Sequence, residues 1–180
     1  MAKNKNIILG VTASIAIYKE CDILRTLMSE GFKVNVVMTK EATELIRPIV
    51  FQSLSGNKVY QGMFEVPESW EIEHISLATK ADLVLVAPAT ANIIGKVASG
   101  ISDDLLTCAI SATKAPVLFA PAMNEAMYKN KITQGNIKKL ESLGYKFIGP
   151  RCGRLACGKT GSGCLAEVDE IVRAAIAAVK

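Results

Sequence analysis

The run Leu83-Val84-Leu85-Val86-Ala87 is the most strongly apolar stretch of this chain, and it decides the fold. Five aliphatic residues in succession leave no polar face, so they predict a strand that is buried on both sides. Strands of this kind belong to parallel sheets that are covered by helices on both faces. The rest of the chain should therefore alternate between strands and helices.

Four further apolar runs predict strands, and they lie at residues 7–11, 34–38, 117–120 and 145–148. Helical patterns separate these runs, because apolar residues recur there every three or four positions. The helical stretches are residues 17–28, 103–112, 132–143 and 168–179, and the acidic pair Asp103 and Asp104 opens the second of them. This alternation predicts an α/β fold with a doubly wound parallel sheet, a three-layer sandwich of the flavodoxin-like or Rossmann-like kind. Residues 56–70 are the least regular and are expected to form a surface excursion.

The overall composition predicts a single domain that spans residues 1–180. The formal net charge is +4 and the sequence contains no block of like charges, so no nucleic-acid partner is expected. The basic N-terminus lacks an A-x-A-like cleavage site, and no window approaches the ~20 apolar residues of a membrane span. The five cysteines, an odd number, favour a reducing compartment. We therefore expect a cytoplasmic protein without a membrane partner.

The cysteines near the C-terminus do not predict a metal site. The spacing Cys152-x4-Cys157-x6-Cys164 differs from the C-x2-C pairs that are typical of zinc sites. His74 is the single histidine, and it lies far from these cysteines in the sequence. We therefore expect no bound metal.

The segment from Gly153 to Thr160 matches the phosphate-loop pattern G-x-x-x-x-G-K-[ST], which is typical of nucleotide-binding proteins. A phosphate loop must open a helix, whereas here two helix-breaking glycines follow within three residues. Only about twenty residues remain, too few for another strand with a magnesium-binding aspartate. We instead predict a flexible, glycine-rich substrate flap at about residues 149–167, with Cys157 as its reactive thiol.

The loops that follow the strands should carry the binding site, because ligands bind beyond the carboxyl ends of the strands in such sheets. The first loop holds Gly10, Thr12, Ala13 and Ser14. Its small residues let the backbone approach an anion, and its hydroxyls can donate to one. It has one glycine where a dinucleotide loop has three, which favours a monophosphate over a pyrophosphate. The same residues are equally suited to cap a helix, so both roles stay open.

Similar residues follow two other strands. Thr39 comes directly after the second strand, and Pro88, Thr90, Ala91 and Asn92 come after the apolar run. Proline is expected to end the strand, and a hydroxyl and an amide then stand just before a helix. Capping is again the simple alternative. A binding role gains weight because these loops share one edge of the sheet.

Three side chains are candidates for chemistry. Asn124 follows the strand at residues 117–120, and its amide could bind a carboxylate with fixed geometry, while Met127 is more ordinary as a packing residue. His74 is the only near-neutral base apart from the cysteines, although a lone histidine is more often structural. Cys157 stands in a glycine-rich loop, unlike a normal buried cysteine, and is a candidate proton donor or nucleophile.

Six segments match one family in order, and they are residues 10–19, 74–78, 88–92, 96–104, 121–127 and 155–163. Together they resemble the flavin-dependent cysteine decarboxylases. The elements Pro121-Ala-Met-Asn-x-x-Met127 and Ala156-Cys157-Gly158 are specific, whereas the first loop alone is not. The resemblance implies a flavodoxin-like fold that binds FMN and not FAD. It also implies a homo-oligomer, a trimer often stacked into a dodecamer, with active sites at subunit interfaces.

The resemblance further implies a reaction. FMN would oxidise the thiol-bearing carbon of a cysteine conjugate to a thioaldehyde, the carboxylate would leave as CO2, and the resulting enethiolate would be reduced. His74 would orient or deprotonate the substrate, Asn124 would hold its carboxylate, and Cys157 would protonate the enethiolate. The other matching residues would contact the substrate, and they are Met127, Ala156 and Gly158. Relatives that stop at the enethiol lack this cysteine, so Cys157 favours the coenzyme A branch, whose small phosphorylated substrate is 4′-phosphopantothenoylcysteine.

The sequence departs from the family at Tyr128, where tryptophan is usual, and at Cys164, where arginine is common. Many bacterial members carry a fused ligase domain, so this chain is either a decarboxylase on its own or part of a longer protein.

Two alternatives within the superfamily are a flavin prenyltransferase and a non-catalytic flavoprotein regulatory subunit. The two specific elements argue against the first, and the presence of His74, Asn124 and Cys157 argues against the second. A phosphate-loop nucleotidase is the remaining alternative.

Overall fold

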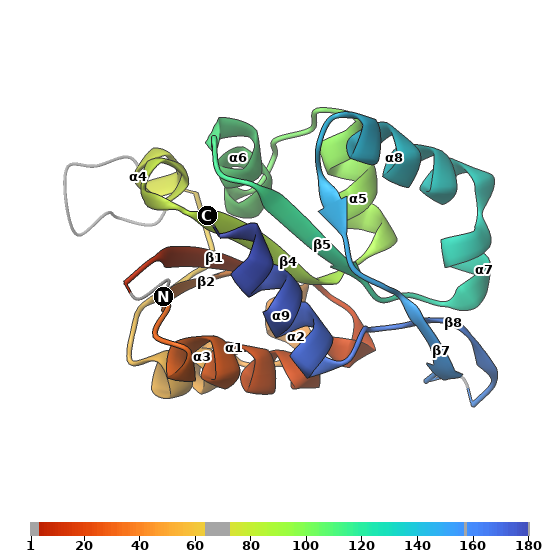
Figure 1. The fold of residues 1–180 in the computed structure, drawn as a ribbon, viewed down its shortest axis with the longest axis horizontal. Helices are drawn as coiled ribbons and strands as arrows, with labels where there is room; N and C mark the ends of the chain where they lie inside the picture. The colour runs from red at the N-terminus through yellow and green to blue at the C-terminus, as the bar shows by residue number, and fades with distance from the viewer. Residues whose placement is uncertain (1–3, 64–72, 157, 180) are drawn as a thin grey trace.

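The computed structural model describes residues 4–63, 73–156 and 158–179. Its centre is a six-stranded sheet in the order β3-β2-β1-β4-β5-β6, and every pairing within it is parallel (Figure 1). The strands are β1 (Asn6–Val11), β2 (Lys33–Met38), β3 (Val59–Tyr60), β4 (Leu83–Ala89), β5 (Val117–Pro121) and β6 (Lys146–Phe147). The predicted doubly wound parallel sheet is therefore confirmed.

The strand order explains why the sequence fitted two related folds. With the two-residue edge strand β3 included, the order is that of a Rossmann sheet. Without β3, the remaining five strands follow the order of flavodoxin. β3 lies in the stretch that the sequence marked as irregular, and it pairs with β2 only through Val59 and Tyr60. One short edge strand thus separates the two descriptions.

Alternate side chains of the strands enter two hydrophobic cores on opposite faces of the sheet. In β1, Ile7 and Leu9 pack into one core, whereas Ile8 packs into the other. All seven residues of β4 are buried, as a central strand between two layers of helices requires. The apolar run that predicted the fold is therefore the middle of the sheet, where it contributes to both cores.

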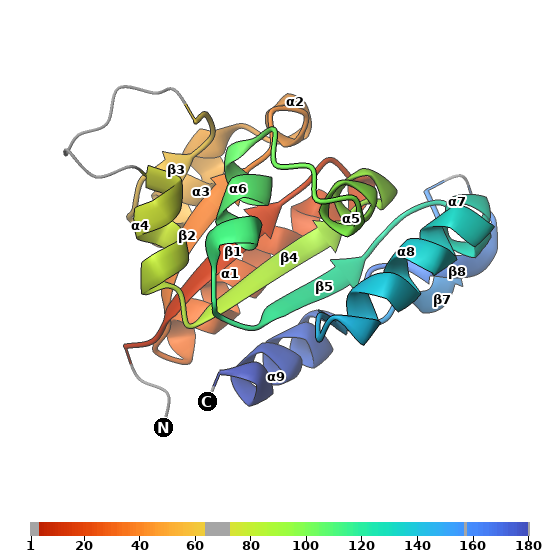
Figure 2. The same cartoon turned by 90° about the horizontal axis from the view of Figure 1, so that it is seen from above.

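Helices cover both faces of the sheet (Figure 2). The first face carries α1 (Glu20–Ser29), α3 (Pro48–Ser55) and α9 (Val168–Ala178). The second face carries α4 (Glu73–Lys80), α5 (Ala91–Ala98), α6 (Leu105–Ala112) and α8 (Lys131–Ser142). Three short elements at the loop edge are the 3-10 helix η1 (Ile15–Lys19), α2 (Ala42–Leu45) and α7 (Glu125–Lys129). Within the described residues, no helix combines the length and the apolar character that a membrane crossing requires.

Helix starts follow local capping chemistry. Asp104 Oδ1 accepts a hydrogen bond of 2.8 Å from the Thr107 N–H, and this capping box opens α6 where the acidic pair predicted a helix.

Pro88 was expected to end its strand, but β4 continues through it to Ala89, with a shift of register against β5 after Val86. Proline is tolerated there because the irregular register needs no ladder hydrogen bond from it.

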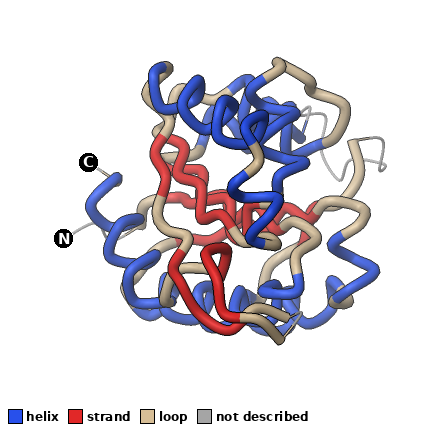
Figure 3. Tube along the Cα trace, turned by 90° about the vertical axis from the view of Figure 1, so that its right-hand side faces the viewer, coloured by secondary structure: helices blue, strands red, loops and turns tan. Residues whose placement is uncertain are grey.

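The segment predicted as a flexible flap is a two-stranded antiparallel ribbon, β7 (Arg151–Arg154) with β8 (Thr160–Cys164). The ribbon lies outside the main sheet (Figure 3). The sequence predicted no strands in this segment, because glycine has a low strand propensity, and the role of the segment as a substrate flap stays a prediction. A strand begins at Thr160, where a phosphate loop requires a helix. The arrangement therefore contradicts the nucleotidase alternative.

Candidate functional site

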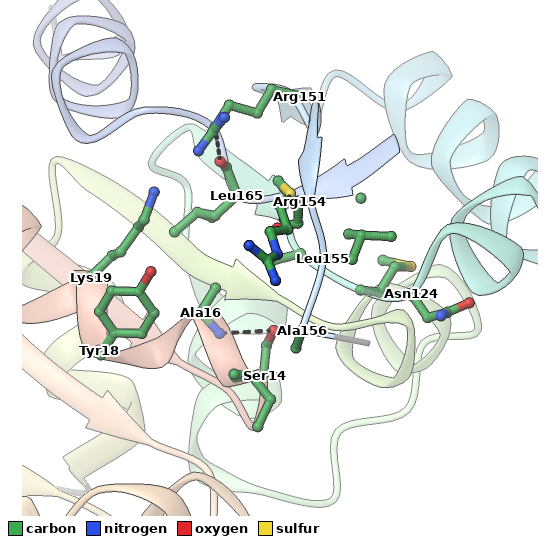
Figure 4. Close-up of a pocket in the computed structure, with 15 residues that line it drawn as sticks. Ser14, Ala16, Tyr18, Lys19, Asn124, Arg151, Arg154, Leu155, Ala156 and Leu165 are labelled. Carbon is green, nitrogen blue, oxygen red and sulfur yellow. Dashed lines mark hydrogen bonds between the residues drawn. The ribbon is translucent and has the colours of Figure 1, made fainter. Parts of the chain in front are cut away.

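A cavity of about 540 Å³ lies at the carboxyl ends of β1 and β5. Its walls are η1, the loop after β5 and the β7–β8 ribbon (Figure 4). In Figure 4 Tyr18 and Lys19 lie on one side and Asn124 on the other, with Arg154 and Leu155 between them. The cavity thus occupies the edge of the sheet at which ligands were expected.

The loops after β1 and β4 are joined by a buried threonine. Thr12 Oγ1 donates a hydrogen bond of 2.6 Å to the Pro88 carbonyl oxygen and accepts one of 3.2 Å from the Thr90 N–H. Thr12 is 2% exposed, so its side chain is shielded from water. The sequence placed these three residues in one site, and the structure brings them together.

Capping accounts for part of the hydroxyl chemistry in these loops. Ser14 Oγ accepts from the Ala16 N–H at 3.4 Å, and Thr90 Oγ1 accepts from the Ile93 N–H at 3.3 Å. Thr39 Oγ1 accepts from the N–H at the start of α2 at 3.3 Å. These bonds are long for helix caps, and each hydroxyl keeps its own hydrogen for a further acceptor. Capping and ligand binding are therefore compatible at these positions.

The remaining loop residues divide into packing and edge positions. A Cβ atom on Gly10 would lie 2.6 Å from Leu106 Cδ1, so this glycine is explained by the packing of β1 against α6. Ala13 is half-buried in the first loop, while Ala91 and Asn92 form the first turn of α5, with Asn92 exposed. Gly10 thus has a structural reason that the sequence did not reveal.

Asn124 stands at the start of α7 and lines the cavity. Its Oδ1 accepts a hydrogen bond of 2.9 Å from the Ala126 N–H. This bond fixes the orientation of the side-chain amide and leaves both hydrogens of the amide nitrogen available. The cap therefore holds the amide of a residue that lines the cavity.

Glu125 connects the same loop to the ribbon. Its Oε1 accepts a hydrogen bond of 3.2 Å from the Ser162 N–H and pairs with Lys129 Nζ at 2.8 Å. The Lys129 hydrogen bond, followed by the Ser162 hydrogen bond, lowers the pKa of the Glu125 carboxyl. The loop after β5 and the ribbon are thus held together beside the cavity.

Not all predicted residues lie at the cavity. Ala156 lines it, whereas Gly158 is exposed at the tip of the ribbon and Met127 is 49% exposed on α7. His74 is half-buried in the first turn of α4 and is not among the described residues that line the cavity. Cys157 lies outside the described residues.

Within the described chain, no group of three or more His, Cys, Asp or Glu side chains could hold a metal ion.

The structure adds lining residues that sequence reasoning did not find. Tyr18 and Lys19 come from η1, and Arg151 and Leu165 come from the ribbon and the segment after it. The Arg151 Nε–H donates to the Leu165 carbonyl oxygen at 3.2 Å. No local pattern marks these residues, because they reach the cavity only when the ribbon folds back toward η1.

The sequence matches the family described as Flavoprotein over residues 1–180. It is 46% identical over 173 residues to the Coenzyme A biosynthesis bifunctional protein CoaBC of Borreliella burgdorferi, a match that covers 96% of this chain and 44% of that protein. It is 45% identical over 171 residues to the probable phosphopantothenoylcysteine decarboxylase of Streptococcus mutans, covering 94% of this chain and 96% of that protein. The chain thus spans less than half of the bifunctional relative and nearly all of the second.

Two solved structures are similar along almost their whole length. One is a PPC decarboxylase mutant complexed with pantothenoylaminoethenethiol, with a TM-score of 0.84 and 29% identity, covering 97% of this chain and 98% of that chain. The other is the FMN binding protein AtHal3, with a TM-score of 0.82 and 30% identity, covering 97% of this chain and 96% of that chain.

Proposed function

The chain belongs to the flavoprotein family, and we propose that it is an FMN-dependent decarboxylase of 4′-phosphopantothenoylcysteine. The substrate would lose its cysteine carboxylate as CO2, and the product would be 4′-phosphopantetheine, an intermediate of coenzyme A biosynthesis. The Streptococcus mutans relative, which bears the name of this activity, supports the proposal because the similarity covers 96% of its length.

The loop edge fits a flavin mononucleotide. A single phosphate needs several N–H and O–H donors, and the starts of η1 and α5 offer both, with Ser14 and Thr90 as their caps. Thr12 joins the two loops by its hydrogen bond to the Pro88 carbonyl oxygen. Thr39 lies at the end of the neighbouring strand β2. When bound, FMN would supply the two-electron oxidation of the thiol-bearing carbon and its later reversal.

The observation that carries the proposal is the orientation of Asn124 at the cavity. Its oxygen is occupied by the Ala126 N–H, so its amide nitrogen would donate to the carboxylate that leaves. The ribbon closes the same cavity through Ala156, directly before Cys157. Cys157, the next residue in the sequence, would then protonate the enethiolate in the final reduction.

We further propose that the protein is a homo-oligomer, a trimer or an assembly of trimers, and that His74 acts in the cavity of a neighbouring subunit. His74 lies on α4, apart from the lining of its own chain. Large apolar side chains are exposed at the cavity, with Ile15 at 63% and Tyr18 at 64%. A surface of this kind favours a protein contact.

The test is the reaction itself. Purified protein loaded with FMN is expected to release CO2 from 4′-phosphopantothenoylcysteine and to form 4′-phosphopantetheine, as measured by gas release and mass spectrometry. Cys157→Ser is expected to release CO2 but to leave the enethiol, which is lighter than the normal product by two hydrogen atoms. Cys152→Ser, on the exposed face of β7, is the matched control and should form the normal product. Absence of CO2 release by the FMN-loaded protein would contradict the proposal.

A further inference from the structure

The cavity has a cationic lining that the chemistry at Asn124 does not use. Lys19, Arg151 and Arg154 all line it, and none of the described lining residues is acidic. Cationic groups in a concave site reinforce one another and raise the local concentration of anions. The lining therefore favours an anionic ligand at the side away from Asn124.

Two of these cations already share one carboxylate. Glu167 Oε1 lies 2.9 Å from Arg151 Nε, and Glu167 Oε2 lies 3.6 Å from Lys19 Nζ. The Lys19 side chain is 19% exposed and the Glu167 side chain is 54% exposed, so only the lysine of this pair is shielded from water. Two positive charges and one negative charge leave this group with a net charge of +1. Glu167 thus positions Lys19 and Arg151 without neutralising them.

Arg154 differs from the other two cations. It is exposed, and within the described residues its guanidinium has no ion-pair partner. Its backbone is fixed, because it pairs with Thr160 across the ribbon and its carbonyl oxygen accepts from Cys164 Sγ at 3.4 Å. Figure 4 shows its guanidinium pointing into the space between η1 and Leu155. A fixed strand thus presents an unpaired fork of donors to the cavity.

A phosphomonoester suits this arrangement. Arg154 adds one charge to the +1 of the Glu167 group, and the resulting +2 matches a phosphate dianion. Guanidinium groups bind phosphate through two parallel hydrogen bonds. A substrate carboxylate bound at Asn124 would leave these donors of Arg154 free for the phosphate. In Figure 4 Asn124 lies on the opposite side of Arg154 from Lys19, so a ligand with an anion at each end could contact both.

We propose that Arg154, supported by Lys19 and Arg151, binds the phosphate group of the substrate. The inference rests on the proposed function for the identity of that substrate, and it adds an orientation: the phosphate lies at the cationic wall and the carboxylate at Asn124. The cavity would therefore distinguish 4′-phosphopantothenoylcysteine from its unphosphorylated form, pantothenoylcysteine. This preference would come from side chains of the ribbon and η1.

The experiment compares kcat/KM for these two substrates in the FMN-loaded protein. Arg154→Gln is expected to reduce the preference for the phosphorylated substrate about tenfold, the effect of one charge-assisted hydrogen bond. Arg154→Lys should retain part of the preference. Arg173→Gln, at an exposed position of α9 away from the lining, removes the same charge and should leave the preference unchanged. An unchanged preference in Arg154→Gln would overturn the proposal.

A second measurement separates the substrate phosphate from the flavin phosphate. The dissociation constant of FMN is measured for the wild-type protein and for Arg154→Gln, and it is expected to be the same. A weaker affinity for FMN in the variant would assign Arg154 to the cofactor and overturn the inference.

If the wild-type protein decarboxylates neither substrate, the proposed function fails, and calorimetry still tests the phosphate site. The probes are then 4′-phosphopantetheine and pantetheine. The phosphorylated compound should bind more tightly to the wild-type protein, and Arg154→Gln should remove that difference. Equal affinities in the wild-type protein would overturn the phosphate site as well.

Discussion

The backbone N–H of Met123 donates a hydrogen bond of 3.0 Å to the carbonyl oxygen of Gly163, and this contact joins the β7–β8 ribbon to the loop after β5. A Cβ atom on Gly163 would fall far inside contact distance of the Met123 carbonyl oxygen. Gly163 also has a φ of +143°, which side-chain-bearing residues rarely adopt. Glycine is therefore required where the ribbon meets the loop that carries Asn124.

Gly163→Ala is expected to separate the ribbon from this loop. The free energy of unfolding should fall by about 3 kcal/mol or more, because backbone atoms must move. The decarboxylation rate should fall with it, since Asn124 and the ribbon would no longer share one cavity. Urea unfolding and steady-state kinetics measure the two effects.

Gly100→Ala is the matched control for that variant. Gly100 has a φ of +71° but nothing within 4 Å of its added Cβ. Its substitution should cost only backbone strain, about 1–2 kcal/mol, with an unchanged rate. Equal losses of stability and rate in both variants would contradict the steric explanation.

The contact between Glu125 and Ser162 should weaken in acid. The Lys129 and Ser162 hydrogen bonds lower the pKa of Glu125, so the folded state is favoured while this carboxyl is ionised. That stabilisation is present above the usual glutamate pKa of about 4.3 and is lost as the pH falls through the lower folded value. We expect the hydrogen-exchange protection factor of the Ser162 N–H to fall as the pH is lowered from about 6 to about 3.

Glu125→Gln should show low protection of the Ser162 N–H already at neutral pH, with little further change in acid. Glu141→Gln, an exposed position of α8, should behave like the wild-type protein. A protection factor that is independent of pH in the wild-type protein would show that the carboxylate does not hold the ribbon.

Glu20 should make the protein less stable as the pH rises. Its side chain is 0% exposed, and within the described residues neither carboxylate oxygen has a hydrogen-bond partner. Burial raises the pKa of Glu20 well above its ordinary value. The unfolded chain releases this proton near pH 4.3 while the folded chain keeps it, so above that pH the unfolded state binds fewer protons. Stability then falls by up to about 1.4 kcal/mol per pH unit until the folded pKa is reached.

Urea unfolding between about pH 5 and about pH 8 measures this slope. Glu20→Gln keeps the shape of the side chain but cannot ionise, so it should remove most of the slope. Glu30→Gln, at the exposed end of the same helix, should keep it. A wild-type slope that Glu20→Gln does not change would assign the pH dependence to other groups.

The sheet could be predicted from the sequence because its signal is local. Residues 83–87 are apolar on both faces in any surroundings, and Asp104 caps its helix by contacts within three residues. The ribbon could not be predicted, because glycines such as Gly163 weaken the strand signal. The reason for this glycine is the Met123 carbonyl, which is distant in the sequence.

The candidate site was predicted in part for the same reason. Thr12 and Thr90 follow strands, so the topology alone brings them to one edge. Lys19 and Arg151 enter the cavity only through the fold of the ribbon and their shared partner Glu167. That partnership depends on side-chain geometry and leaves no pattern in the sequence.

Asn124→Asp separates helix capping from substrate binding. Asn124 Oδ1 accepts from the Ala126 N–H at 2.9 Å, and Asn130 Oδ1 accepts from the Ile132 N–H at 2.8 Å at the start of α8. Aspartate caps a helix as well as asparagine does, so either substitution should change the free energy of unfolding by less than about 0.5 kcal/mol.

The two variants should differ sharply in catalysis. Asn124→Asp replaces an amide donor with a second negative charge where the substrate carboxylate is proposed to bind. Two like charges placed next to each other cost several kcal/mol, so kcat/KM should fall about 100-fold or more. Asn130 does not line the cavity, and Asn130→Asp should retain the wild-type rate. Thermal unfolding and decarboxylation assays on both variants measure this contrast, and a wild-type rate in Asn124→Asp would rule out Asn124 as the carboxylate-binding residue.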